Sequence, residues 1–131
     1  MMKINKELLT QVTSQAAESP RLRMNYNFHE GPDSKAQRLL NALEPGTILP
    51  IHRHRHTAET YILLRGKLNV IFYNDMGGEV DRFALDPQMD EYGVHIPAGQ
   101  WHTVEVLEHG TVIFEVKDGP YMPLEPEDMM D

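Results

Sequence analysis

Two histidines and a glutamate stand at a fixed spacing between two glycines in the segment GTILPIHRHRHTAETYILLRG, residues 46–66. His52, His54 and Glu59 follow the pattern Gly-x5-His-x-His-x4-Glu-x6-Gly, and the later run IPAGQWH ends at a fourth candidate ligand, His102. Side chains alternate along a strand, so the two histidines of His-x-His face one side, about 6.6–7 Å apart. Imidazoles at that separation can converge on one ion at about 2.0–2.1 Å. The pattern therefore predicts a metal site between paired β-strands.

The chemistry of this ligand set narrows the ion that it can hold. Three imidazoles and one carboxylate favour a transition metal over Ca²⁺ and Mg²⁺, which prefer oxygen ligands. Four protein ligands leave positions free on a five- or six-coordinate ion, as catalytic metals require. We therefore expect one divalent transition metal, either iron, zinc, manganese or nickel, whose affinity falls below roughly pH 6 as the imidazoles gain protons. The alternative is that these are ordinary polar residues in the mouth of a barrel.

Strict alternation of apolar and polar residues at period two runs through residues 21–29, and strand-like segments separated by turn signals continue from residue 35 onward. It follows a helix predicted over residues 6–17, which Asn5 can cap and which Ser19-Pro20 ends. Strands are predicted over 21–29, 36–43, 48–54, 58–64, 67–73, 80–85, 93–96, 101–107 and 111–117. Short strands separated by turn signals favour an all-β sandwich or barrel, here a single domain of 131 residues with the barrel over about 21–118. The tail, 119–131, contains three prolines and four carboxylates and is expected to be extended or frayed.

The two ligand-bearing blocks together resemble the motifs of the cupin superfamily, G(x)5HxH(x)3-4E(x)6G and G(x)5PxG(x)2H(x)3N. The first motif matches at every defined position, and the second matches at Pro97, Gly99 and His102. Glu91 replaces the leading glycine of the second motif and Val106 its final asparagine, but neither position is a metal ligand.

A narrower resemblance is to the WbuC-type cupin fold metalloproteins, small bacterial proteins of which some occur beside surface-polysaccharide genes. It covers almost the whole chain and is carried by four segments, residues 19–29, 52–60, 96–108 and 114–121. It implies a double-stranded β-helix, the cupin jelly-roll barrel, with a short N-terminal helix. It also implies a metalloprotein with a link to surface polysaccharide biosynthesis.

Two further residues are candidates for moving a proton beside the metal. Tyr61 lies two residues after Glu59 and hence on the same strand face, where its phenol either acts on a substrate or packs across the sheet. His95 is the second candidate, if its side chain faces the cavity. Glu115, within the apolar run IFEVK, points either to solvent or into the cavity. His56 is an additional ligand, a base that acts from beside the ligands, or a solvated turn residue.

One face of the predicted strand 21–29 carries two guanidinium groups and two amides, from Arg21, Arg23, Asn25 and Asn27. Arginine binds carboxylate or phosphate with two parallel hydrogen bonds, so this face is a candidate substrate-binding clamp. The alternative is a hydrated edge strand, whose charges prevent aggregation.

Charge and composition exclude several classes of function. A formal net charge of −8 argues against nucleic-acid binding, which needs clustered Lys and Arg. The chain has no cysteine, no long apolar run and no signal-peptide pattern at its start, so we expect a cytoplasmic protein without a membrane partner. A homodimer is expected, because the N-terminal strand offers an edge for pairing.

Three functions remain open. The first is a metal-dependent isomerase, epimerase or lyase acting on a small polar molecule that is sugar-derived or carries a carboxylate. The second is an Fe(II)-dependent dioxygenase, in which substrate and O₂ share the open positions of the ion. The third is a non-catalytic metal- or ligand-binding module, which would be stabilised by its ligand without turnover.

Overall fold

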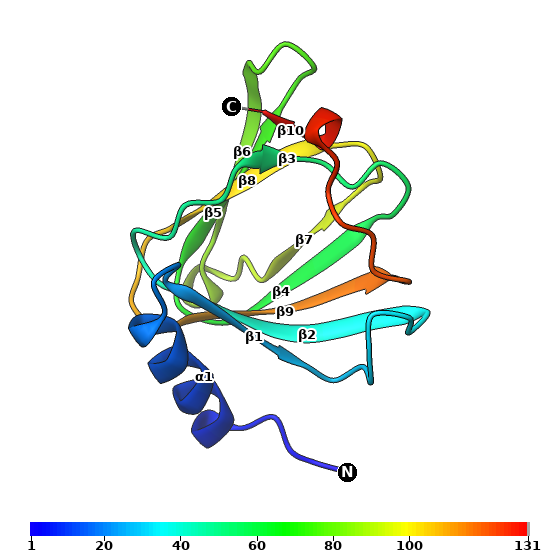
Figure 1. Cartoon of the computed structure of the whole chain (residues 1–131). Helices are drawn as coiled ribbons and strands as arrows, with labels where there is room; N and C mark the ends of the chain where they lie inside the picture. Colours follow the sequence, from blue (N-terminus) through cyan, green and yellow to red (C-terminus); the bar gives the residue numbers. More distant parts are fainter. Residues whose placement is uncertain (131) are drawn as a thin grey trace.

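The computed structural model describes residues 1–130, which fold into two antiparallel β-sheets facing each other with one helix outside (Figure 1). The strand orders are β1-β2-β9-β4-β7 and β10-β3-β8-β5-β6. The strands are β1 (Arg23–Asn27), β2 (Ala36–Leu43), β3 (Ile51–His52), β4 (Glu59–Arg65), β5 (Leu68–Tyr73), β6 (Glu79–Leu85), β7 (Gly93–Ile96), β8 (Trp101–Val106), β9 (Thr111–Asp118) and β10 (Met129–Met130). The predicted all-β jelly roll with a short N-terminal helix is confirmed.

Helix α1 (Lys6–Glu18) matches the predicted helix to within one residue. It begins at Asn5, whose side-chain oxygen accepts a hydrogen bond from the backbone N–H of Leu8 at 3.0 Å. Leu8, Val12 and Ala16 are buried in a cluster with residues of β2 and β9, so the helix covers the outer face of the first sheet (Figure 1). No helix within residues 1–130 is long and apolar enough to cross a bilayer.

Most predicted strands agree with the structure to within one residue, and β1 and β3 are the exceptions. Strand β1 starts later than predicted because Leu22 has a positive φ of 57°, which interrupts extended chain before Arg23, and it also ends earlier, at Asn27. Strand β3 spans two residues where the sequence predicted 48–54. Pro50 has no N–H with which to extend the pairing, and after His52 the chain turns from one sheet toward the other.

The tail is more regular than its composition suggests. A 3₁₀ turn, η2 (Pro126–Asp128), leads into β10, which pairs with β3 in the register Met129↔His52. Figure 1 shows this segment leaving the end of β9 in the first sheet and joining the second sheet beside β3. The expectation of an extended or frayed tail was therefore wrong for residues 126–130.

The space between the two sheets is filled by one apolar cluster, to which both sheets contribute. Tyr61 and Leu63 of β4 belong to it from the first sheet, and Val104 of β8 from the second. Alternation along these strands places Glu59 on the inner face of the first sheet and His102 on the inner face of the second. These two candidate ligands thus lie on opposite walls of one interior.

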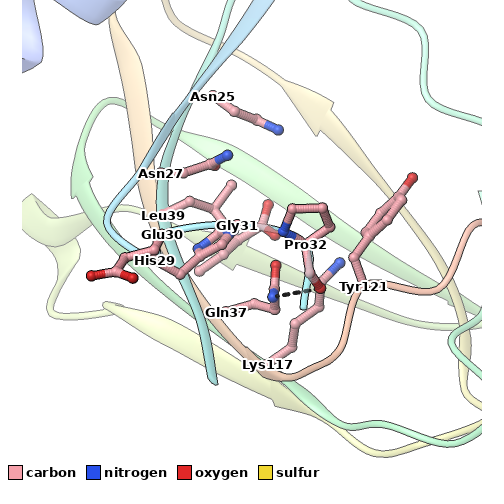
Figure 2. A pocket seen from close by; sticks show the side chains of 11 residues that line it. Asn25, Asn27, His29, Glu30, Gly31, Pro32, Gln37, Leu39, Lys117 and Tyr121 are labelled. Atoms are coloured by element: carbon pink, nitrogen blue, oxygen red, sulfur yellow. Dashed lines mark hydrogen bonds between the residues drawn. The ribbon is translucent and has the colours of Figure 1, made fainter. Parts of the chain in front are cut away.

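The interior opens into a cavity of about 480 Å³ at one end of the first sheet (Figure 2). Its walls come from β1, β2, β9 and the tail. Figure 2 shows the amides of Asn25 and Asn27 on one side, with Lys117 and Tyr121 on the other. Glu115 of β9 also lines this cavity and is buried, with 8% of its surface exposed.

Candidate metal centre

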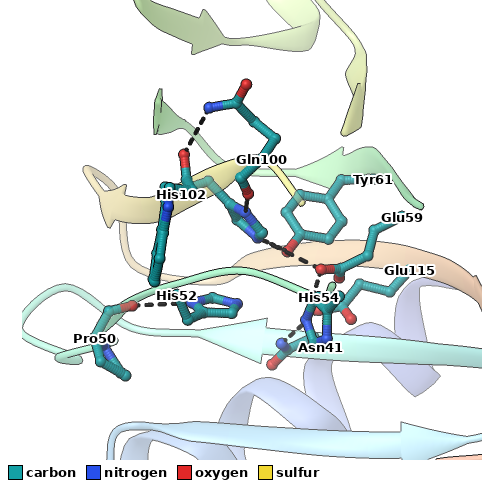
Figure 3. Close-up of polar contacts among 10 residues, drawn as sticks. Asn41, Pro50, His52, His54, Glu59, Tyr61, Gln100, His102 and Glu115 are labelled. Atoms are coloured by element: carbon teal, nitrogen blue, oxygen red, sulfur yellow. Dashed lines mark hydrogen bonds and ion pairs between the residues drawn. The ribbon is translucent and has the colours of Figure 1, made fainter. Parts of the chain in front are cut away.

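His52, His54, Glu59 and His102 converge between the two sheets, as the sequence predicted (Figure 3). Each offers one ligand atom, and these four atoms all lie within 4.8 Å of one another. Ligands bound to one ion at about 2.0–2.2 Å can be at most about 4.4 Å apart, so a small contraction completes a coordination shell. The His52 and His102 side chains come from directly paired positions on β3 and β8.

Backbone carbonyls orient two of the imidazoles. Nδ1 of His52 donates to the carbonyl oxygen of Pro50 at 2.9 Å, and Nδ1 of His102 donates to that of Gln100, also at 2.9 Å. In each case the acceptor lies two residues before the histidine. With Nδ1 as the donor to a carbonyl, Nε2 is the ring nitrogen left to present a lone pair to a metal.

The carboxylate of Glu59 provides the test of whether an ion fits. Its Oε1 is buried and has no hydrogen-bond partner among the described residues, although it lies 2.8 Å from Nε2 of His54 and 3.4 Å from Nε2 of His102. Several lone pairs thus point at a common centre in a buried place, where unpaired acceptors are costly. A divalent cation satisfies all of them at once, so the residues present fit a metal.

The protonation of the ligands favours the same conclusion. Burial and the neighbouring His102 lower the pKa of His52 to about 4, which keeps this ring neutral near pH 7. Burial by itself would raise the pKa of Glu59, but the adjacent imidazoles of His102 and His54 outweigh it and lower the pKa. The cluster therefore holds a neutral imidazole and a carboxylate anion, both in the protonation state that metal binding needs.

His54 lies outside any strand, so the loop that carries it depends on contacts from elsewhere. The backbone N–H of Gly99 donates to the carbonyl oxygen of His54 at 2.8 Å, and Gly99 itself has a positive φ of 85°. The second motif thus supplies one ligand and also supports the loop of the first motif. Trp101 faces away from the interior, where it stacks under Arg53 at 4.6 Å from the ring centroid.

Tyr61 lies beside the cluster, as its strand position predicted. Its hydroxyl is 3.4 Å from Nε2 of His102, and the side chain is 5% exposed. Burial and the charge of Glu59 raise its pKa well above the ordinary value for tyrosine. The phenol therefore keeps its proton and is available as a hydrogen-bond donor.

His95 was a candidate only if its side chain faced the cavity, and in the structure it does not. Its side chain is exposed on the outer face of β7 and lies 3.0 Å from the hydroxyl of Thr60. Its neighbours Val94 and Ile96 are buried, so alternation along the strand directs His95 outward. His56 is also exposed and is not part of the cluster.

Only part of the predicted clamp on residues 21–27 lies at the cavity. Asn25 and Asn27 line the cavity, whereas Arg21 lies in an exposed turn. Arg23 donates to the hydroxyl of Thr47 and to the carbonyl of Ile48, at 3.3 and 3.1 Å. The two guanidinium groups are therefore absent from the cavity lining, and the two amides remain as candidates for substrate contact.

Glu115 is a residue whose direction the sequence left open, and the structure turns it inward. It pairs across the sheet with Tyr61, and its Oε1 accepts from Nδ2 of Asn41 at 2.9 Å. Burial and the charge of Glu59 raise its pKa, so this carboxyl retains a proton more readily than an ordinary glutamate. Figure 3 shows it next to Glu59 and His54, and it is also one of the residues that line the cavity.

Two residues of the site were missed from the sequence. Asn41 was treated only as part of a strand, although an amide within the apolar run RLLNAL is a signal of an interior polar contact. Asp128 contacts the loop around His54 from 75 residues away, and no local pattern indicates that contact.

A family model described as a domain of unknown function (DUF6016) matches residues 4–85, which is more than half of the chain. The match includes the first three ligands and ends before His102. No curated protein sequence matches the chain.

Solved structures of cupin-fold proteins match the fold. KdgF from Halomonas sp. is 14% identical, with a TM-score of 0.60 over 77% of this chain and 82% of its own. CapF, a capsular polysaccharide assembling protein from Staphylococcus aureus, is 20% identical, with a TM-score of 0.62 over 93% of this chain and 35% of its own. A mutant of oxalate decarboxylase OxdC from Bacillus subtilis is 21% identical, with a TM-score of 0.57 over 75% of this chain and 25% of its own.

This chain therefore spans about a third of CapF and a quarter of the decarboxylase. At these identities the likeness establishes the cupin jelly-roll fold and no more. The narrower WbuC-type likeness stays a prediction.

Proposed function

The chain belongs to the DUF6016 family of domains of unknown function, and we propose that it is a metal-dependent enzyme acting on a small polar substrate. One divalent transition metal, iron, zinc, manganese or nickel, is held by His52, His54, Glu59 and His102. The observation that carries the proposal is a juxtaposition: four ligand atoms within 4.8 Å stand beside a buried carboxyl that also lines a polar cavity.

The cavity lining supports a substrate that is sugar-derived or carries a carboxylate. The amides of Asn25 and Asn27 offer both donors and acceptors to hydroxyl groups, and Lys117 offers a cation to an anionic group. Arg21 and Arg23, predicted as substrate-binding residues, are not retained in this role because they lie outside the cavity lining.

A metal bound at the cluster supplies Lewis-acid polarisation of a substrate carbonyl or hydroxyl oxygen. The chain's own residues handle protons on either side of it. The phenol of Tyr61 donates a hydrogen bond from beside His102, while the carboxyl of Glu115, fixed by Asn41, exchanges a proton with a group in the cavity. Two proton-bearing groups with raised pKa beside a Lewis acid support isomerase, epimerase or lyase chemistry.

A finer proposal is that the chain is a WbuC-type cupin that serves surface polysaccharide biosynthesis in the cytoplasm. The four segments quoted above support it, and so does the fold shared with CapF, which is described as a capsular polysaccharide assembling protein. We also propose a homodimer that pairs through β1, because β1 is an edge strand of its sheet. Light scattering of the purified protein tests the dimer.

Metal content tests the proposal first. Protein purified without a chelator or a histidine tag should contain about one equivalent of metal, and His102→Ala should contain far less. Sugar acids and nucleotide sugars are then screened with the loaded protein, with Glu115→Gln as the variant expected to bind metal and lose turnover.

Each outcome of the screen separates the proposed function from its rivals. Turnover without O₂ supports an isomerase, epimerase or lyase. O₂ consumption that requires iron establishes a dioxygenase instead. Thermal stabilisation by a ligand without turnover indicates a binding module. Failure of the wild-type protein to take up any metal refutes the proposal.

A further inference from the structure

The C-terminal segment (residues 125–130) contacts the loop that carries His54. The carboxylate of Asp128 accepts hydrogen bonds from Nε of Arg53 at 3.2 Å and from Nε of Arg55 at 3.1 Å, and Nη2 of Arg55 lies 3.0 Å from the same oxygen. The backbone N–H of Arg53 also donates to the carbonyl oxygen of Asp128 at 3.0 Å. Asp128 is itself buried, with 8% of its surface exposed. One carboxylate thus anchors both neighbours of a metal ligand.

This arrangement fixes the direction of the ligand between them. Arg53 and Arg55 both reach outward to Asp128, while His54 lies between them and directs Nε2 to within 2.8 Å of Glu59. The carbonyl of His54 is held from the other side by Gly99. With both flanking side chains and its own carbonyl bound, the His54 residue has little freedom to turn its ring away from the cluster.

The same segment also completes the strand that carries His52. Strand β3 has only two residues and lies between β8 and β10, in the register Met129↔His52 and His52↔His102. Without β10, this two-residue strand would be a bare edge paired on one side only. The segment therefore pairs with the backbone at His52 and binds the side chains on either side of His54.

A further contact leads from Asp128, through Arg53, to Trp101, the residue before His102. Arg53, held by Asp128, lies over the ring of Trp101 at 4.6 Å, and Trp101 immediately precedes His102 on β8. Trp101 is fixed in turn by its indole N–H, which donates to Asp75 at 3.1 Å. The packed side chains run from Asp128 through Arg53 to the residue beside a third ligand.

We infer that Asp128 is a positioning residue for the metal centre, acting through Arg53 and Arg55 to hold His54 in its binding orientation. The inference rests on the proposed metal centre. Outer contacts of this kind orient metal ligands, and their loss typically costs about 10–100-fold in metal affinity. Asp128 touches neither metal nor substrate in this arrangement.

The test measures Zn²⁺ affinity by competition with a chromophoric chelator, together with the visible absorption of the Co²⁺-loaded protein. Asp128→Asn keeps the size of the side chain and removes its charge, and we expect it to bind Zn²⁺ about 10-fold more weakly or worse, with an altered Co²⁺ spectrum. Glu127→Gln is the matched control, because it removes one negative charge from an exposed residue of the same segment and should change neither. The single tryptophan, Trp101, gives an independent fluorescence signal of metal uptake.

Several outcomes would decide the matter. A purely structural role would lower the melting temperature of Asp128→Asn while leaving its Zn²⁺ affinity at 20 °C and its Co²⁺ spectrum unchanged, and that result overturns the inference. If Asp128→Asn does not fold, Arg55→Gln, which removes one partner from a half-exposed position, decides by the same two readouts. Asp128→Glu, which retains the charge, should recover part of the affinity. Wild-type protein that binds neither ion refutes the metal centre itself, whereas equal binding by wild type and Asp128→Asn refutes only the positioning role.

Discussion

Exchange of Glu59 for Gln should abolish stabilisation by metal, while the same exchange at Glu115 should leave it intact. Both side chains are buried and face the interior from adjacent strands, β4 and β9. Both substitutions keep the shape and remove the carboxylate. Only Glu59 belongs to the ligand cluster, so the pair isolates ligation from the general effect of a buried carboxyl.

The expected size follows from the length of the chain. A ligand at 100 times its dissociation constant stabilises the native state by about 2.7 kcal/mol. The entropy of unfolding, about 2.1 cal/mol/K per residue, amounts to about 0.28 kcal/mol/K for 131 residues, so the melting temperature should rise by about 10 °C. Loss of a direct metal ligand should weaken metal affinity by at least roughly 100-fold, which is the loss that removal of a residue hydrogen-bonded to a ligand can cause. The rise for Glu59→Gln then shrinks to under about 2 °C at the same metal concentration.

Differential scanning fluorimetry with and without Zn²⁺ measures both variants beside the wild type. The compared quantity is the difference between the two melting temperatures of each protein, so an effect of the substitution on the metal-free protein cancels. A full 10 °C rise in Glu59→Gln, or an equal loss of the rise in Glu115→Gln, would refute the assignment of Glu59 as the carboxylate ligand.

Three further results are expected. The metal-free protein should lose about 2–3 kcal/mol of unfolding free energy between about pH 6.5 and pH 4. The reason is that the unfolded chain binds a proton at His52 below pH 6.5, whereas the native state does not bind it until about pH 4. Urea titrations should find a smaller loss in His52→Gln, and a loss equal to that of the wild type would contradict this explanation. Gly66→Ala should lower the unfolding free energy by about 2–4 kcal/mol, because Gly66 has a φ of 98° and an added Cβ would lie 2.6 Å from the Cα of Thr111. Gly31→Ala, whose added Cβ would have no atom within 4 Å, should lower it far less in the same urea titration. Tyr61→Phe should change the unfolding free energy by less than about 1 kcal/mol, because only one long hydrogen bond of 3.4 Å is lost while the buried ring stays; a larger loss by calorimetry would show that the hydroxyl is a structural group.

The ligand set could be predicted from the sequence because spacing and strand alternation constrain it strongly. The expected geometry of these ligands, however, was only partly correct. His52 lies on a strand, as expected, but β3 ends there, so His54 reaches the cluster from a loop and not from the same strand face. Burial also lowers the pKa of His52 to about 4, an effect of its surroundings that the sequence did not indicate, while the expected fall of metal affinity below roughly pH 6 stays a prediction.

The errors have distinct physical causes. The direction of His95 was left open, although its apolar neighbours Val94 and Ile96 already indicated, by alternation, that it faces outward. The contact of Asp128 with the ligand loop could not be predicted in this way. A lone carboxylate in a tail rich in prolines gives no local periodicity, and its partners are fixed only by the completed sheet.

The pairing of Arg53 with Asp128 across 75 residues has a consequence for how the protein folds. Contacts at such a separation carry a large loop-closure entropy and form slowly in β-proteins. The peptide that contains His52, His54 and Glu59 therefore lacks, in isolation, both the fourth ligand and the contacts that direct the other three. Metal uptake then reports a late step of folding, in which the two sheets pack against each other. In a stopped-flow refolding experiment, the appearance of the Co²⁺ spectrum should lag behind the recovery of secondary structure, so the ion would act as a probe of topology.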